Sequence, residues 1–109
     1  LKNLNLVLGL HNVPLLPGVI ELAESGLIPA GTYNNRIQYE DMVHGMQAFP
    51  DEEVDILYDA QTSGGFLLAV SPDKAEGIIQ SLKNAGFERS ICIGRFKPGE
   101  GMIEIVDNI

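Results

Sequence analysis

The sequence predicts a mixed α+β fold, because stretches with the periods of strands and of helices alternate along the chain and two strand-like stretches close it. Leucines alternate with other residues over 4–10, as in a strand, and residues 66–70 form a continuous apolar run. Between this run and the closing strands, residues 71–86 carry apolar side chains at spacings of three and four, which indicates an amphipathic helix. Layers of helices on a sheet are the economical arrangement of these elements.

The first half contains two further predicted helices. Pro17 suits a first helical turn and Gly26 a helix end, so we expect a short helix near residues 17–25. Three carboxylates at 51–53 favour the first turn of a helix that ends near Tyr58. The stretch 28–50 has no sustained period and contains several glycines, asparagines and prolines. We expect it to be a long ordered loop, of the kind that is often functional.

In the second half, glycines precede the run Phe66–Val70 and "SPD" follows it, which predicts a central strand covered on both faces. Ser71 and Pro72 are suited to begin the following helix. "SICIGRF" and "MIEIV" read as two strands joined by the hairpin turn "KPGEG". Cys92 alternates with isoleucines in the first of them, so we predict a buried core residue and not a reactive thiol.

Composition narrows the classes of function. With 109 residues, 45% of them hydrophobic, the chain fits one domain spanning 1–109. A net charge of -8, from 15 acidic and 7 basic residues, argues against a nucleic-acid partner. A single cysteine excludes an internal disulfide, and no long apolar span suggests a membrane, so the cytoplasm is the expected setting. Because the chain starts at Leu1, directly before a strand, we expect a piece of a longer protein.

The segment "YDAQTSGGF", residues 58–66, is the most informative motif. Phosphate-binding P-loops run from strand through glycine-rich loop to helix, so that helix amides face the anion. Here the predicted order is helix, loop, strand, which excludes that mechanism. Adjacent glycines still allow a backbone concavity or the close approach of another chain. The residues alone leave both a structural turn and a ligand-binding or interface role open.

Other polar residues give no catalytic or metal site. His11 and His44 lie far apart in sequence in polar contexts, and surface positions explain them better than a shared metal. The carboxylates at 51–53, with Asp55 and Asp59, are explained better by a helix start than by magnesium. No nucleophile and base stand out as a pair, so we assign no catalytic and no metal-binding residue.

Three segments together resemble one family. "DAQTSGGFLLAV" resembles the D-P-Q-T-S-G-G signature, with its following apolar strand, in the C-terminal part of selenophosphate synthetases (selenide, water dikinases). "VPLLPGVIELAESGLIPAGTYNN" and "IGRFKPGEGMIEI" resemble, in the right order, the family's P-x-L-P-G to G-G-T-x-x-N segment and its closing hairpin. The resemblance covers the chain from about Val13 to its end. Ala60 and Ala30 depart from it, standing where the family usually has proline and often has glycine.

The resemblance implies the C-terminal domain of the aminoimidazole ribotide synthetase-like superfamily, a three-layer α/β/α domain with a mixed sheet. The full-length enzyme it implies makes selenophosphate, AMP and phosphate from selenide, ATP and water, using Mg²⁺. A missing N-terminal domain would bind most of the ATP and magnesium and form the homodimer. The catalytic cysteine or selenocysteine and lysine would lie upstream of Leu1. The fragment alone is therefore expected to bind no cofactor, to be inactive and to be monomeric.

The resemblance also marks candidates to face the cleft against the nucleotide-binding domain. They lie in two segments: Gln61, Thr62, Ser63, Gly64 and Gly65 in one, and Thr32, Asn34 and Asn35 in the other. Two alternative interpretations stay open: that the chain is the same domain of another ATP-dependent synthase of the superfamily, or that it is an interaction module without catalysis.

Overall fold

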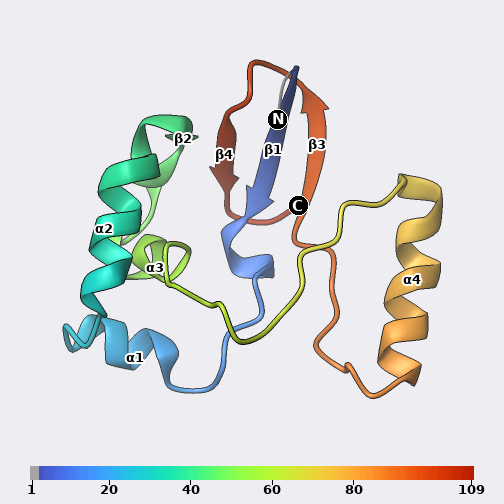
Figure 1. Ribbon diagram of the computed structural model, residues 1–109, viewed down its shortest axis with the longest axis horizontal. Helices are drawn as coiled ribbons and strands as arrows, with labels where there is room; N and C mark the ends of the chain where they lie inside the picture. The colour runs from blue at the N-terminus through green and yellow to red at the C-terminus, as the bar shows by residue number, and fades with distance from the viewer. Residues whose placement is uncertain (1–2) are drawn as a thin grey trace. The chain divides into compact units, whose positions relative to one another are not determined.

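The computed structural model describes residues 3–109 and has an α+β fold with one mixed sheet, which confirms the predicted class (Figure 1). The chain forms two compact units, the first comprising the residues up to Ala60 together with Ile93–Ile109, and the second Gln61–Cys92. The strands are β1 (Leu4–Gly9), β2 (Val43–His44), β3 (Gly94–Pro98) and β4 (Ile103–Val106). The helices are α1 (Val19–Glu24), α2 (Ala30–Tyr39), α3 (Asp51–Ile56) and α4 (Pro72–Asn84), with short 3₁₀ turns at Leu10–Asn12, Glu40–Met42 and Met46–Ala48.

The four strands lie in the order β2-β4-β1-β3, so β1 is flanked by the two strands that close the chain. It pairs antiparallel with β3 and parallel with β4. The predicted hairpin is therefore wrong: the turn joins two strands that lie on opposite sides of β1. Crossing two strand spacings takes about 10 Å, which a connection of this length can span. The turn is tied to the first strand, since Gly99 donates its amide to the Asn3 carbonyl.

Asn5 of β1 organises this crossing. Its side-chain oxygen accepts hydrogen bonds from the amides of Gly101 (3.1 Å) and Met102 (3.0 Å), and its amide group donates to Glu104 (3.0 Å). Hydrogen bonds from Lys97 and then Asn5 lower the pKa of Glu104. Asn5, the second residue of the strand, thus gives hydrogen-bonding partners to backbone amides that would pair with the opposite strand in a hairpin.

The hydrophobic core lies in the first unit and joins α3 to the sheet. Its buried members are Leu10, Val43, Val54, Tyr58 and Ile105. Val54 of α3 is 0% exposed and so marks the centre of this core. α3 begins at Asp51 as predicted, and its three carboxylates lie in the first turn. The helices predicted at 17–25 and 71–86 are confirmed as α1 and α4, and glycines of positive φ, Gly26 and Gly86, follow their ends.

The prediction of a loop over residues 28–50 is wrong, because α2 occupies ten of these residues and β2 and two 3₁₀ turns follow. α2 lacks an apolar stripe. The face that it turns to residues 55–59 carries hydrogen-bonding side chains instead. A periodicity of apolar residues cannot reveal such a helix.

The central strand predicted at 66–70 is also wrong. These residues have no strand pairing, and Phe66 is 98% exposed. Cys92, predicted in the core, is exposed and lies before β3 begins at Gly94. An apolar run becomes a strand only where neighbouring backbone supplies hydrogen-bonding partners. Between residues 61 and 92, all of which the structure describes, no residue is buried.

Candidate functional site

The loop Gln61–Gly65 begins where the first unit ends. Thr62 and Ser63 form a turn, and all five residues are exposed. Gly65 has φ +69°, a conformation that glycine adopts without strain. A Cβ atom built on Gly64 or Gly65 would meet no atom within 4 Å. Space around the two glycines is therefore open, and only Gly65 is explained by its backbone conformation.

α2 fastens the segment that leads into this loop. The buried hydroxyl of Thr32, a residue 1% exposed, donates to Oδ1 of Asp59 at 3.2 Å. The side-chain amide of Asn35 donates to the carbonyl oxygen of Tyr58 at 2.8 Å. Both acceptors lie within three residues of Gln61. Two residues expected to face a nucleotide cleft thus bind the stem of the loop, whereas Asn34 is exposed.

Arg36 extends the same face of α2 toward α3. Its guanidinium contacts Asp55 at 2.6 Å and Asp51 at 2.7 Å, and Glu40 lies 3.7 Å away. Donation of hydrogen bonds to Asp51 and to Asp55 raises the pKa of Arg36. Asp55 is a buried carboxylate, and the pairing compensates for its lost hydration. The guanidinium is therefore committed to this chain's own carboxylates.

These contacts follow one order. Thr32, Asn35 and Arg36 occupy positions i, i+3 and i+4 of α2, so they lie on one face of the helix. Their partners run the opposite way along the chain, from Asp59 through Tyr58 to Asp55. The spacing T-x-x-N-R is the sequence signal that would have predicted this polar face, had the stretch been recognised as helical.

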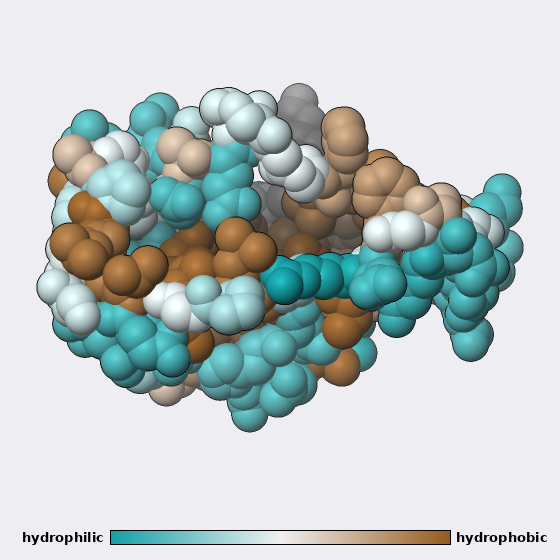
Figure 2. Space-filling view, turned by 90° about the horizontal axis from the view of Figure 1, so that it is seen from below, coloured by the Kyte–Doolittle hydropathy of each residue, from teal (hydrophilic) through white to brown (hydrophobic). Residues whose placement is uncertain are grey.

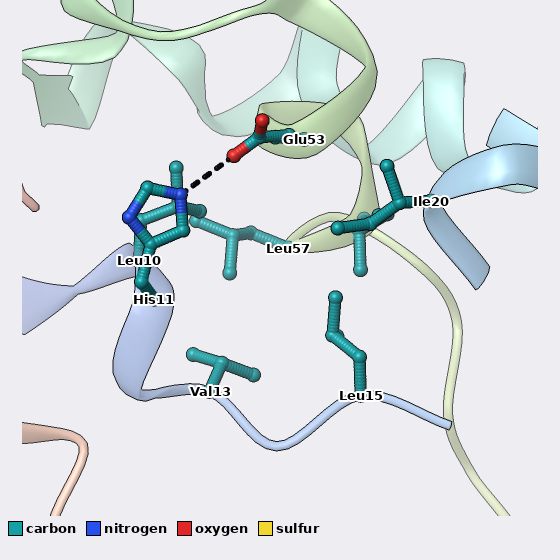
Figure 3. A pocket seen from close by; sticks show the side chains of 8 residues that line it. Leu10, His11, Val13, Leu15, Ile20, Glu53 and Leu57 are labelled. Atoms are coloured by element: carbon teal, nitrogen blue, oxygen red, sulfur yellow. Dashed lines mark hydrogen bonds and ion pairs between the residues drawn. The ribbon is translucent and has the colours of Figure 1, made fainter. Parts of the chain in front are cut away.

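A second feature of the first unit is an open, mainly apolar hollow of about 240 Å³. Leucine, isoleucine and valine side chains project toward it from both sides in Figure 3, with His11 and Glu53 at one edge. Its lining residues are Leu10, His11, Val13, Leu15, Ile20, Glu53, Ile56 and Leu57. Hydrophobic side chains also gather at the left of Figure 2, the side on which Figure 1 places α1; Leu16, Leu22 and Leu27 are exposed in and beside this helix.

His11 joins three parts of the first unit. Its Nε2 lies 2.8 Å from Glu53 of α3, its Nδ1 contacts Asp107 after β4, and its ring meets Phe49 edge to face. A neutral imidazole has one N–H, so donation to both carboxylates requires the protonated ring. Hydrogen bonds that the ring donates to Asp107 and, as the second cause, to Glu53 raise the pKa of His11 accordingly. The sequence predicted only a surface position for His11. It could not reveal the bonds to Glu53 and Asp107, because both residues are distant from His11 in the sequence.

Between residues 3 and 109, no three His, Cys, Asp or Glu side chains are grouped so that they could hold a metal ion. No helix in the same part of the chain is both long and apolar enough to cross a membrane.

Comparisons with known proteins point to one family. The chain is 46% identical to a selenide, water dikinase of Nitratidesulfovibrio vulgaris over 74 residues, which are 68% of this chain and 21% of that protein. It is 40% identical to the enzyme of Geobacter sp. (strain M21) over 92 residues, covering 84% and 26%. The match to the Clostridioides difficile enzyme is 38% over 96 residues, covering 87% and 28%. No family model matches the chain.

These similarities confirm the resemblance to selenophosphate synthetases that the three motifs predicted. The chain spans about a quarter of the length of the curated relatives it matches.

Proposed function

We propose that this chain, a relative of one part of the selenide, water dikinases, is the C-terminal domain of a selenophosphate synthetase. The full-length enzyme would convert selenide, ATP and water into selenophosphate, AMP and phosphate, in the cytoplasm. The observation that carries the proposal is the sequence identity of 38–46% over most of the chain. The alternative of a different synthase of the superfamily has no comparable support, since the relatives reported share one name.

In this proposal the loop Gln61–Gly65 faces the cleft that the chain closes against a nucleotide-binding domain. Gln61, Thr62 and Ser63 supply an amide and two hydroxyls in succession, which can donate to polyphosphate oxygens or to the opposing backbone. The open space around Gly64 and Gly65 supports the close approach of such a group. The loop would orient the substrate, and Asn34 on the exposed side of α2 is a further candidate contact.

The remaining parts of the reaction are proposed to come from an N-terminal domain, which would also form the homodimer. Residues 3–109 contain no group of side chains suited to a metal, and Arg36 is committed to aspartates. No step through Mg²⁺ is therefore derived from this chain. We expect the 109 residues alone to show no ATP turnover, and Mg²⁺-dependent turnover above a no-protein control would contradict this.

The loop is tested in the full-length enzyme by replacing both hydroxyls, Thr62→Ala with Ser63→Ala. Two hydrogen bonds worth ~1 kcal/mol each correspond to a decrease in selenophosphate formation of about 30-fold, with nearly unchanged melting temperature. The matched control is Ser25→Ala with Ser81→Ala, which removes two exposed hydroxyls that bond their own helical turns. Wild-type turnover and ATP affinity in the loop variant would show that the loop is a turn only.

A further inference from the structure

Two residues of α2 bind the segment that directly precedes the proposed site. We propose that Thr32 and Asn35 are positioning residues, which hold Tyr58 and Asp59 so that the loop Gln61–Gly65 starts from a fixed point. This inference rests on the proposed function, because it concerns the placement of that loop. It assigns the two side chains to the stem of the loop in place of direct contact with a nucleotide.

Tyr58 is held at several points. Its carbonyl oxygen accepts from Asn35, its amide donates to the Asp55 carbonyl at 2.9 Å, and its hydroxyl lies 3.2 Å from the sulfur of Met46. The ring belongs to the hydrophobic core. Burial is the main cause of the raised pKa of Tyr58. The backbone is therefore fixed two residues before Ala60, the last residue of the first unit.

Asp59 continues this anchoring by one residue. Its carboxylate accepts from Thr32 at 3.2 Å, and its amide donates to the Ile56 carbonyl at 3.2 Å. The Thr32 hydroxyl is buried, and Asp59 gives it a hydrogen-bonding partner. Loss of this bond would leave a buried hydroxyl without a partner, which costs free energy. From Asp59 to Gln61 the chain extends at most about 7 Å. Fixing Asp59 therefore limits the positions that Gln61 can reach.

The loop itself lies at the surface. Residues 60–70 are all exposed, and Gly64 and Gly65 add backbone freedom. A loop of this kind pays an ordering cost when it binds a ligand, and fixing one end of it lowers that cost. Loss of the anchor should accordingly weaken substrate binding more than it slows chemistry in the bound complex.

The test replaces Thr32 in the full-length enzyme. Thr32→Val keeps the shape and removes the hydroxyl, whereas Thr32→Ser keeps the hydroxyl and serves as the conservative rescue. We expect Thr32→Val to raise KM for ATP roughly two- to tenfold, in line with one hydrogen bond, and Thr32→Ser to stay near wild type. A fraction of misfolded protein would lower kcat and leave KM unchanged, so KM separates positioning from stability.

Amide hydrogen exchange in the same variants, without nucleotide, gives a readout independent of activity. The amides of Tyr58 and Asp59, which donate to Asp55 and Ile56, should exchange faster in Thr32→Val, and the amide of Val54 should not change. Asn35→Ala, at a half-buried position, provides a second variant with the same expectation. Unchanged KM and unchanged exchange in both variants, or equal effects of Thr32→Ser and Thr32→Val, would overturn the proposal.

Failure of the proposed function can be distinguished from failure of the positioning role of Thr32 and Asn35. If the Thr62 and Ser63 double variant keeps its ATP affinity while Thr32→Val accelerates exchange at Tyr58 and Asp59, the positioning role of Thr32 stands and the proposed function of the loop fails. If the double variant loses affinity and Thr32→Val changes neither quantity, the function stands and the anchor fails.

Discussion

The two units of the chain both contain apolar segments, but only the first unit buries them. The first unit contains the buried core, and its polar side chains are paired across long sequence separations, as at Asn5, Arg36 and His11. In the second unit, Gln61–Cys92, no residue is buried, and its apolar run begins with Phe66 at 98% exposure. An apolar stretch therefore favours burial, but whether it is buried depends on packing and hydrogen-bonding partners that other segments supply.

The largest expected effect contrasts one glycine from each unit. Gly45 has φ +87°, and a Cβ built there would lie 2.4 Å from the Ile105 carbonyl oxygen. Backbone strain and overpacking together predict that Gly45→Ala lowers the free energy of unfolding by about 3 kcal/mol. Urea denaturation followed by circular dichroism measures this loss. An effect below about 1 kcal/mol would show that the close approach at β4 is not enforced.

Gly65→Ala is the counterpart in the second unit. Its φ of +69° is similar, but nothing lies within 4 Å of the added carbon, so only strain remains. We expect a loss of about 1 kcal/mol, and Gly64→Ala, also in open space, as a control with almost none. Equal losses for Gly45→Ala and Gly65→Ala would break the contrast between the two units.

A smaller effect concerns the pH dependence of the first unit. Because the pKa of His11 is raised by Asp107 and Glu53, its contribution to stability is full below the unfolded value of about 6.5 and is lost as pH rises through the folded pKa. Stability should therefore fall as pH rises from about 6.5 through the folded pKa of His11, and Glu53→Gln should reduce that slope. NMR titration of the His11 ring checks the direction: a folded pKa at or below about 6.5 would contradict it.

The sequence was sufficient for the class of fold, because the periodicity of β1, the caps of α1 and α4 and the carboxylates of α3 are local signals. It was not sufficient for the sheet order. In that order the segment between β3 and β4 is bonded by Asn5, which lies almost a hundred positions away in the sequence. A local turn signal at 97–101 therefore suggested a hairpin where the strands flank β1.

The candidate site was predicted in part. The resemblance identified the loop 61–65 and the three residues of α2, but it could not show that Thr32 and Asn35 bind Asp59 and Tyr58. Those contacts require α2 to be a helix, and its helical face is polar and carries no hydrophobic period. His11 was missed for a similar reason, since its two carboxylates come from α3 and from the segment after β4.

Amide hydrogen exchange of the full-length protein, with and without ATP and Mg²⁺, tests the central claim most directly. The first unit contains the buried core, and the loop following it is proposed to engage the substrate. Nucleotide should therefore slow exchange at residues 61–65 and leave the amides of the core, such as that of Val54, unchanged. Identical exchange at 61–65 in both states would contradict it.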